Sequence, residues 1–378
     1  MSVKFSPPRA VFHAGMVRSP KSRLIGLLTI PPLLSTGDSL RGQWSKGLAR
    51  LAKALVSDGP ALSLTPIAAE SVSPRTALVV STTGSSGVAK EIELSATALL
   101  ASAKSSNKYL GAEPGNTWSL LLPLNHIAGI NVLIRSLELG TLPTNLLGYE
   151  GNFPKVDFTA VVPTQLFRAL NGDENLLNHL KAAKAVLVGG AALTKELRDQ
   201  AESAGIRIIE TYGSTETSGG CIYNGNPLEG IEVSIGVDNR IAIKGKVLAQ
   251  AVASEDGWYY TSDIGHLEDG KVIIDGRIDD VVISGGENVS LSAIDRALAQ
   301  HFPDIQSAAF AIANPEWGQA IHLALVGADS SIESEIQQLL EGELGSAAKA
   351  KGFHYLSELP LIGIGKIDKK ALARLAHE

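Results

Sequence analysis

The chain has 378 residues, of which 44% are hydrophobic and 19% are charged, a length that predicts two or three domains in a protein of ordinary globular composition. Its formal net charge of −6 argues against non-specific binding of nucleic acid. The single cysteine, Cys221, excludes an internal disulfide and a cysteine-based metal cluster, which is consistent with a reducing compartment.

The first part of the chain carries little functional signal. Its most apolar run, residues 24–34, contains Pro31-Pro32, is too short to cross a bilayer and is followed by no clear cleavage pattern. We therefore expect a cytoplasmic protein with no signal peptide and no membrane insertion. Apolar residues at helical spacing predict one packing helix over about residues 40–56.

From residue 76 the sequence alternates between strands and helices. Five apolar runs are each followed by a polar loop, and they cover residues 76–82, 118–122, 158–162, 185–188 and 207–210. Helices are expected to end at about Tyr109 and Gly140, to follow Thr164 and to span 194–204, with Ser95 as the first N-cap. This order predicts a largely parallel sheet with helices on its faces, where ligands bind beyond the carboxyl ends of the strands.

After about residue 225 the pattern predicts short antiparallel strands and then a compact tail. Strand hairpins are expected at Asp238-Asn239 and Asp269-Gly270. The predicted tail elements are strands 281–284, 307–313 and 320–326, with helices over 291–301, over 332–341 and after Asp368. The domain boundary is predicted at residues 276–280.

The most unusual stretch follows the strand 76–82. Ser81 to Gly87 consists only of Ser, Thr and Gly, and Lys90 follows three positions later. Hydroxyls and flexible backbone N–H groups suit phosphate oxygens, although the spacing is not that of the common P-loop. By itself, this stretch is equally compatible with a solvated linker.

Five further positions suit nucleotide chemistry, and each also has a plain structural interpretation. Glu216, at a strand end, suits a magnesium ion that accompanies a nucleotide, or is an exposed loop carboxylate. Asp263 suits two ribose hydroxyls or bonds its own turn, and Arg277 precedes two acids and could merely pair with one of them. His126 opens a helix, where a lone histidine is more often structural. Lys366, between glycines and apolar residues, suits a transferring phosphoryl group or is one of many surface lysines.

In their order and spacing these segments resemble the adenylate-forming superfamily of acyl-CoA synthetases, peptide-synthetase adenylation domains and luciferases. The resemblance covers about residues 76–372. Its six motifs are Thr82-Thr-Gly-Ser-Ser-Gly-Val-Ala-Lys90, Pro123-Leu-Asn-His126, Tyr212-Gly-Ser-Thr-Glu216, Thr261-Ser-Asp263, Gly276-Arg-Ile-Asp-Asp280 with Gly285-Gly286, and Gly365-Lys366-Ile367. The resemblance implies an α/β fold with a large N-terminal domain of αβ-layered sheets (residues 1–276) and a small mobile α+β domain (residues 280–378).

The resemblance also implies roles for individual residues. Positions expected to bind ATP or AMP are Thr82, Thr83, Gly84, Ser85, Ser86, Gly87, Lys90, Gly189, Gly190, Tyr212, Gly213, Thr215, Asp263 and Arg277. Lys366, Glu216 and His126 are expected to be catalytic, with Glu216 holding Mg²⁺. Asp279 matches the hinge of the small domain, and Gly285-Gly286 would meet the co-substrate CoA. Positive charge around the α-phosphate is what such a reaction needs, because a carboxylate attacks a phosphate there.

Three features depart from the superfamily pattern. Ala89 replaces a common Pro after the phosphate loop, and Glu91 replaces a common Gly. The region before that loop has only about 80 residues, so the N-terminal part must be reduced.

The short front end and the segment 121–137 look most like 2-succinylbenzoate–CoA ligases of menaquinone synthesis. In those relatives an arginine nine residues after the His faces the ring carboxylate, and Arg135 has that spacing from His126. Arg135 is thus expected to bind substrate with His126, unless it lies on the solvent face of its helix. The sequence is also compatible with activation of an aryl or fatty acid, with acyl transfer to a carrier protein, and with a non-catalytic nucleotide-binding protein.

Overall fold

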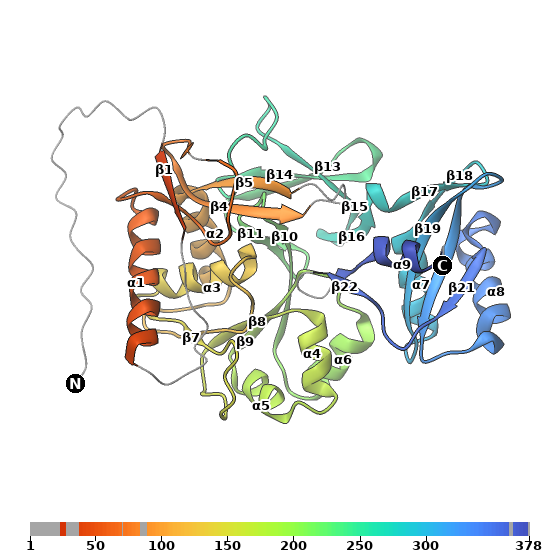
Figure 1. Ribbon diagram of the computed structural model, residues 1–378, viewed down its shortest axis with the longest axis horizontal. Coiled ribbons are helices and arrows are strands. Elements are labelled where there is room, and N and C mark those ends of the chain that lie inside the picture. Colours follow the sequence, from red (N-terminus) through yellow and green to blue (C-terminus); the bar gives the residue numbers. More distant parts are fainter. Residues whose placement is uncertain (1–22, 28–37, 70, 84–88, 363–365, 377–378) are drawn as a thin grey trace.

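The computed structural model describes residues 23–27, 38–69, 71–83, 89–362 and 366–376 (Figure 1). Within these residues the chain forms four sheets of four to seven strands and a two-stranded sheet near the carboxyl end. The first three larger sheets lie in one part of the molecule, and the fourth forms a smaller part at its other end (Figure 1). None of the described helices has the length and apolar character needed to cross a membrane.

The first sheet contains the strand that precedes the Gly/Ser loop. Its order is β3-β1-β2-β4-β5. Its elements are β1 (Arg23–Leu27), β2 (Ala61–Ser63), β3 (Ser71–Val72), β4 (Thr76–Thr83) and β5 (Ala89–Ser95), and helix α1 (Asp38–Leu55) packs nearby. The expected helix over 40–56 is confirmed by α1.

The prediction that residues 76–82 join the parallel sheet is wrong. Strand β4 is parallel to β2 but pairs antiparallel with β5, from Thr76 opposite Ser95 to Thr83 opposite Ala89. Ile92 and Leu94 are buried and alternate with polar Glu91 and Glu93, which is the pattern of a half-buried strand. The chain after the Gly/Ser loop therefore returns along β4 before it enters the next helix.

The second sheet is the centre of the large part and has the order β12-β11-β10-β9-β8-β6-β7. Its strands are β6 (Trp118–Leu120), β7 (Thr144–Asn145), β8 (Phe158–Val161), β9 (Ala185–Val188), β10 (Ile208–Ser214), β11 (Gly219–Tyr223) and β12 (Asn226–Pro227). The run from β7 to β10 is parallel, whereas β11 and β12 are antiparallel. Four of the five predicted strands thus lie in this sheet, and three of them (β6, β8 and β9) are followed by a helix as predicted. The helix expected after the strand at 207–210 is wrong, because β10 leads through a turn into the antiparallel strand β11.

Helices cover both faces of this sheet. They are α2 (Ala96–Tyr109), α3 (Ile127–Glu138), α4 (Pro163–Leu170), α5 (Glu174–Ala182) and α6 (Lys195–Ser203). Strand β9 shows why two faces are needed, because Leu187 belongs to the cluster that contains α2 and α3 whereas Val186 belongs to the cluster that contains α4 to α6. Ser95 caps α2 by accepting a hydrogen bond from Ala98 N, as predicted.

The third sheet is antiparallel, with the order β13-β14-β15-β16. Its strands are β13 (Ile231–Ile235), β14 (Arg240–Gly245), β15 (Tyr259–Glu268) and β16 (Lys271–Arg277), with the 3₁₀ turn η1 (Val237–Asn239) between the first two. Both predicted hairpins are confirmed, and Asp238, Asn239, Asp269 and Gly270 have the positive φ angles that such turns require.

The small part begins after the 3₁₀ turn η2 (Ile278–Asp280). Its strands are β17 (Val281–Ser284), β18 (Glu287–Ser290), β19 (Gln306–Asn314), β20 (Gly318–Val326), β21 (Gly352–Tyr355), β22 (Leu361–Ile362) and β23 (Lys366–Ile367). Its helices are α7 (Leu291–His301), α8 (Glu333–Leu344) and α9 (Lys369–Leu375), with 3₁₀ turns η3 (Ser330–Ile332) and η4 (Ser346–Ala348). Among the described residues, no apolar cluster contains members from both sides of η2.

Candidate active site

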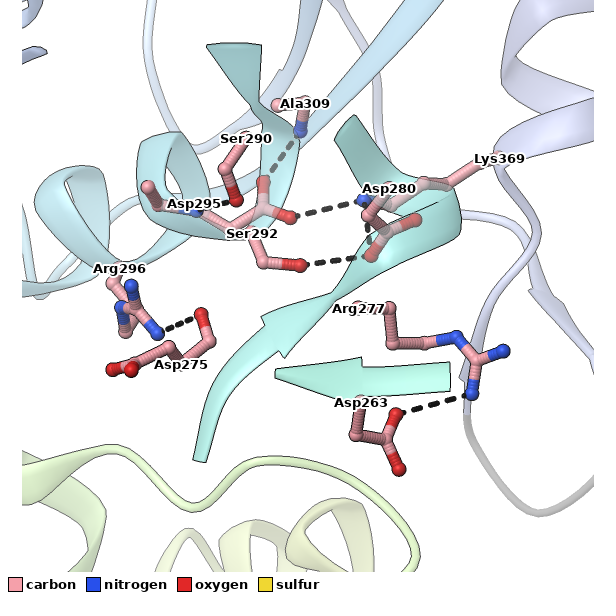
Figure 2. A network of polar contacts seen from close by, with 11 residues as sticks. Asp263, Asp275, Arg277, Asp280, Ser290, Ser292, Asp295, Arg296, Ala309 and Lys369 are labelled. Atoms are coloured by element: carbon pink, nitrogen blue, oxygen red, sulfur yellow. Dashed lines mark hydrogen bonds and ion pairs between the residues drawn. The ribbon is translucent and has the colours of Figure 1, made fainter. Parts of the chain in front are cut away.

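The carboxyl end of β10 meets the antiparallel sheet through a short hydrogen bond. Tyr212 Oη donates to Asp263 Oδ2 over 2.6 Å. Arg277 lies directly opposite Asp263 in the β15–β16 register, and its Nη1 is 3.2 Å from Asp263 Oδ1 (Figure 2). Burial, together with the charge of Asp263, raises the pKa of Tyr212 above its ordinary value, so the phenol stays protonated and continues to donate. Three separately predicted residues are therefore brought together.

Tyr259 completes this cluster and was missed in the sequence. Burial raises its pKa to about 12, and the negative charges of Glu216 and Asp263 act in the same direction, whereas Arg277 opposes them. Glu216 and Asp263 therefore lie within electrostatic reach of one phenol. Strand alternation could have revealed it, because Tyr259, Thr261 and Asp263 share one face of β15.

Close backbone approach explains the glycines at the strand ends. Val188 pairs with Glu210, which sets Gly189 beside Thr211. A Cβ atom on Gly189 would lie 2.2 Å from Thr211 Oγ1, and one on Gly213 would lie 2.1 Å from Gly219 O. Any larger side chain at either position would force the two neighbouring strands or loops apart.

The loop after β10 is held by groups other than the Glu216 carboxylate. Thr217 Oγ1 accepts from Ser214 N over 2.8 Å and donates to Gly219 O over 2.8 Å, while the backbone carbonyl of Glu216 accepts from Ala249 N. Within the described residues, the Glu216 carboxylate has no hydrogen-bond or ion-pair partner. It is half-buried beside Thr215 and is available to a cation.

The base of the Gly/Ser loop is described, but its tip is not. Thr82 pairs with Lys90, and Thr82 Oγ1 donates to Lys90 O over 3.2 Å. The predicted phosphate-binding residues Gly84, Ser85, Ser86 and Gly87, and the side chain of Thr83, lie outside the described residues.

Glu91, which departs from the superfamily pattern, has a structural role. Its Oε1 accepts from Ala68 N over 2.5 Å, and its Oε2 accepts from Ala69 N over 3.3 Å. The carboxylate therefore satisfies two N–H groups of the segment beside β5, which a glycine would leave without these acceptors.

Arg135 is buried, so the interpretation that places it on the solvent face of its helix is wrong. It is 4% exposed on α3, and its Nη2 donates to Tyr223 Oη over 3.1 Å. Its guanidinium lies 5.1 Å from the centroid of the Trp118 ring, and its Nε finds no hydrogen-bond partner among the residues that the structure describes. No carboxylate of the described part of the chain lies within ion-pair distance of this cation. His126, the half-buried N-cap residue of α3, precedes it by two and a half turns.

The remaining predicted residues lie in the small part. Gly285 and Gly286 form the β17–β18 turn with φ angles of 61° and 86°, and Gly285 N donates to Trp317 O over 3.0 Å. Lys366 pairs with Ile362 between β23 and β22. Asp279 lies in η2, and the side chains of Asp279 and Lys366 lie outside the described residues.

Comparisons with known proteins agree on one group of enzymes. Residues 28–247 match the model of the family described as "AMP-binding enzyme". A Mycobacterium tuberculosis protein named "Probable 2-succinylbenzoate--CoA ligase" is 34% identical over 81% of this chain and 86% of its own length. The Escherichia coli 2-succinylbenzoate–CoA ligase is 32% identical, over 63% of this chain and 55% of its length.

A solved structure of a similar fold carries a ligand. It is a single-residue variant of E. coli MenE with bound OSB-AMS, which is 26% identical, has a TM-score of 0.68 and is matched over 83% of this chain and 72% of its own.

Proposed function

The chain belongs to the AMP-binding enzyme family, and from this premise we propose that it is an AMP-forming acid–CoA ligase whose acid is 2-succinylbenzoate. A substrate carboxylate oxygen attacks the α-phosphorus of ATP, and pyrophosphate leaves. The CoA thiolate then attacks the carbonyl of the acyl-adenylate, and AMP leaves as the thioester forms. The convergence of Tyr212, Asp263, Arg277 and Glu216 at the strand ends is the observation that carries this proposal.

The cluster around Asp263 suits the ribose of the nucleotide. Its carboxylate accepts one hydrogen bond from Tyr212 and one from Arg277, which leaves lone pairs for ribose hydroxyls. The Tyr212 ring is fixed by its hydrogen bond at the end of β10, next to the close-packed Gly189 loop. A planar base would find an aromatic face and small residues there.

A single carboxylate at the loop after β10 fits the magnesium ion that accompanies ATP. In the described part of the chain no group of three or more His, Cys, Asp or Glu side chains could hold a metal ion by itself. Mg²⁺ usually binds one or two protein carboxylates and completes its coordination shell with phosphate oxygens and water. Glu216 alone could therefore supply the carboxylate ligand that the protein contributes. When bound, the ion supplies positive charge to the phosphate oxygens.

The two parts of the molecule are proposed to be domains, residues 1–276 and 280–378, that rotate about Asp279. Their apolar clusters are separate, which supports independent packing. Rotation would bring Lys366 to the phosphates for the first step and withdraw it for the second.

The turn Gly285-Gly286 and its surroundings suit CoA. Lys351 Nζ lies 3.8 Å from the centroid of the Trp317 ring, and Trp317 also accepts from Gly285 N. This combination offers an ammonium for a phosphate beside an indole ring. Among the described residues nothing lies within 4 Å of a Cβ added at Gly286, whereas one added at Gly285 would lie 3.1 Å from the Trp317 ring.

Arg135 supports a dicarboxylic substrate. Within the described residues this buried guanidinium has no carboxylate partner, which is a costly arrangement, and the second carboxylate of 2-succinylbenzoate would supply the opposite charge. The M. tuberculosis relative carries the name of a ligase for this acid. The small-molecule reactants ATP, CoA and this acid also fit the cytoplasmic location predicted from the sequence.

The test is AMP release from purified protein with ATP, Mg²⁺, CoA and a panel of acids. We expect AMP and a thioester with 2-succinylbenzoate, and Arg135→Met should raise its KM by about ten- to a hundredfold, because a charged hydrogen bond is worth about 1.5–3 kcal/mol. The variant should leave the KM of benzoate, which lacks the second carboxylate, nearly unchanged.

Three outcomes would contradict the proposal at different levels. AMP formation only with benzoate or hexanoate would refute the substrate and leave the reaction class. Thioester formation only on an added carrier protein would show that the acyl acceptor is a carrier-protein thiol and not CoA. ATP binding without AMP formation from any acid would favour a non-catalytic nucleotide-binding protein.

A further inference from the structure

Lys369 connects three elements of the small part. At the start of α9, its Nζ lies 3.3 Å from Asp295 Oδ2 on α7 and 3.7 Å from Asp280 Oδ2 in η2 (Figure 2). Asp280 Oδ2 also accepts from Ser292 Oγ over 2.8 Å, and Asp295 Oδ1 accepts from Ala309 N over 2.6 Å on β19. One ammonium therefore joins α9 to α7, and through the two carboxylates to η2 and β19.

These contacts are partly buried. The side chains of Lys369, Asp280 and Asp295 are 28%, 27% and 29% exposed. Ion pairs with this little exposure are screened less than surface pairs, and loss of the cation would leave two carboxylates facing each other. Burial already raises the pKa of Asp295, and the charge of Lys369 opposes that rise. Each carboxylate therefore depends on the ammonium.

The position of Lys369 in the chain gives the network its consequence. Lys366 precedes it by three residues, whereas Asp279 is 87 residues before Lys366 and adjoins Asp280. Asp368 N donates to Pro360 O over 2.8 Å, and β22 pairs with β23, so residues 360–362 and 366–368 lie side by side as the two described arms of a hairpin. Any shift of Lys369 is thus transmitted to Lys366 through a short and restrained segment.

We propose that Lys369 is a positioning residue that fixes the hairpin carrying Lys366 to the segment adjoining Asp279. Asp280 is the first residue after the hinge position, so its ion pair makes the small part rigid up to that point. A rotation about Asp279 then moves Lys366 by a defined amount instead of being absorbed within the hairpin. The inference rests on the proposed adenylation chemistry, in which the placement of Lys366 decides the first step.

The experiment compares Lys369→Met with Lys370→Met, its exposed neighbour on α9. Lys369→Met should lower the rate of adenylation by about ten- to a hundredfold, because a misplacement of about 1 Å has effects of that size. It should leave thioester formation from supplied acyl-adenylate within about twofold, and Lys369→Arg should recover most of the adenylation rate. Lys370→Met should match the wild type in both steps.

Hydrogen exchange at the Asp368 amide gives a readout that does not need activity. Lys369→Met should accelerate this exchange and Lys370→Met should not, because only the former releases the base of the hairpin. Leu372 on the same helix is 1% exposed and packs against β19, which keeps α9 folded in both variants.

Two results would overturn the inference. One is a Lys369→Met protein with wild-type adenylation and wild-type exchange at Asp368, which would leave the proposed function standing if AMP still forms. The other is an equal loss of both half-reactions together with a lower unfolding temperature, which would assign Lys369 to stability alone. If the wild type forms no acyl-adenylate, the proposed function fails. Unchanged hydrogen exchange at Asp368 in Lys369→Met would separately show that Lys369 does not hold the hairpin in place.

Discussion

The two halves of the proposed active site are built in different ways. In the large part, Tyr212 and Asp263 come from different sheets and meet at 2.6 Å, with Tyr259 partly buried beside them. In the small part, Lys366 lies on a two-residue strand that is held at its base by the ion pairs of Lys369. One half is fixed by the register of long strands, and the other depends on a few polar contacts.

This difference follows from what each half has to do under the proposed function. The adenine base and the ribose of the nucleotide stay in place through both steps, so the residues that bind them are best held on a rigid scaffold. The cation at the phosphates is needed in only one step, so it belongs on an element that can approach and withdraw. The comparison predicts that changes at the residues around Asp263 affect both half-reactions, whereas changes around Lys366 affect only the first.

The largest expected effect is that of Lys366→Ala. Removing one preorganised cation from the transition state should lower adenylation at least about a hundredfold, as measured by exchange of pyrophosphate into ATP. Thioester formation from supplied acyl-adenylate should stay at the wild-type rate. A wild-type rate of pyrophosphate exchange in Lys366→Ala would show that Lys366 takes no part in the mechanism. Lys370→Ala serves as the matched control.

Asp263→Asn should give a smaller effect that reaches both steps. The variant keeps the shape of the side chain but loses the charge that accepts from Tyr212 and Arg277. We expect the KM of ATP to rise about ten- to a hundredfold, because hydrogen bonds to charged groups contribute about 1.5–3 kcal/mol. The affinity for acyl-adenylate should fall in parallel.

The neighbouring exposed residue provides the control for that variant. Ser262→Ala, on the outward face of β15, should change neither constant. If Asp263→Asn altered only the adenylation step, the proposed difference between residues that act in both steps and a lysine that acts only in the first would be wrong.

The smallest expected effect is on stability at alkaline pH. The pKa of Tyr259 is raised to about 12 in the folded protein, above the ordinary value of about 10. The folded state thus favours the neutral phenol, and this contribution is complete below about pH 10 and is lost as the pH rises toward 12. Tyr259→Phe should therefore flatten the fall of unfolding free energy between about pH 10 and 12.

The measurement is a denaturant unfolding series at several pH values, with Tyr149→Phe as the control because that tyrosine is exposed. Identical slopes for the wild type and Tyr259→Phe would show that the phenol is not held neutral by the cluster. That result would also contradict the inference that the charges of Glu216 and Asp263 both act on the Tyr259 phenol.

Much of the fold could be predicted because it depends on local patterns. The helix at 38–55, the N-cap at Ser95 and the hairpin at Asp269-Gly270 follow from periodicity and turn chemistry within a few residues. The sheet to which β4 belongs could not be assigned in this way. An apolar strand has the same appearance in any sheet, and its partners are decided by packing.

The site shows the same division. Motif order identified Tyr212, Asp263 and Arg277 one by one, and the register of β15 and β16 brought two of them into contact. Tyr259 could have been found from the alternation along β15, whereas the burial of Arg135 could not, because it depends on Trp118 and Tyr223 from distant segments.

The sequence by itself predicted which residues serve nucleotide chemistry. It also determined their order along the chain and many of the helices and turns that present them, since those depend on neighbours within a few positions. Tertiary structure alone decided that the buried Arg135 has no carboxylate partner among the described residues and that Lys369 reaches Asp280 across almost ninety residues of chain. Contacts of this kind depend on how sheets and helices pack, and packing joins side chains without regard to their separation in sequence.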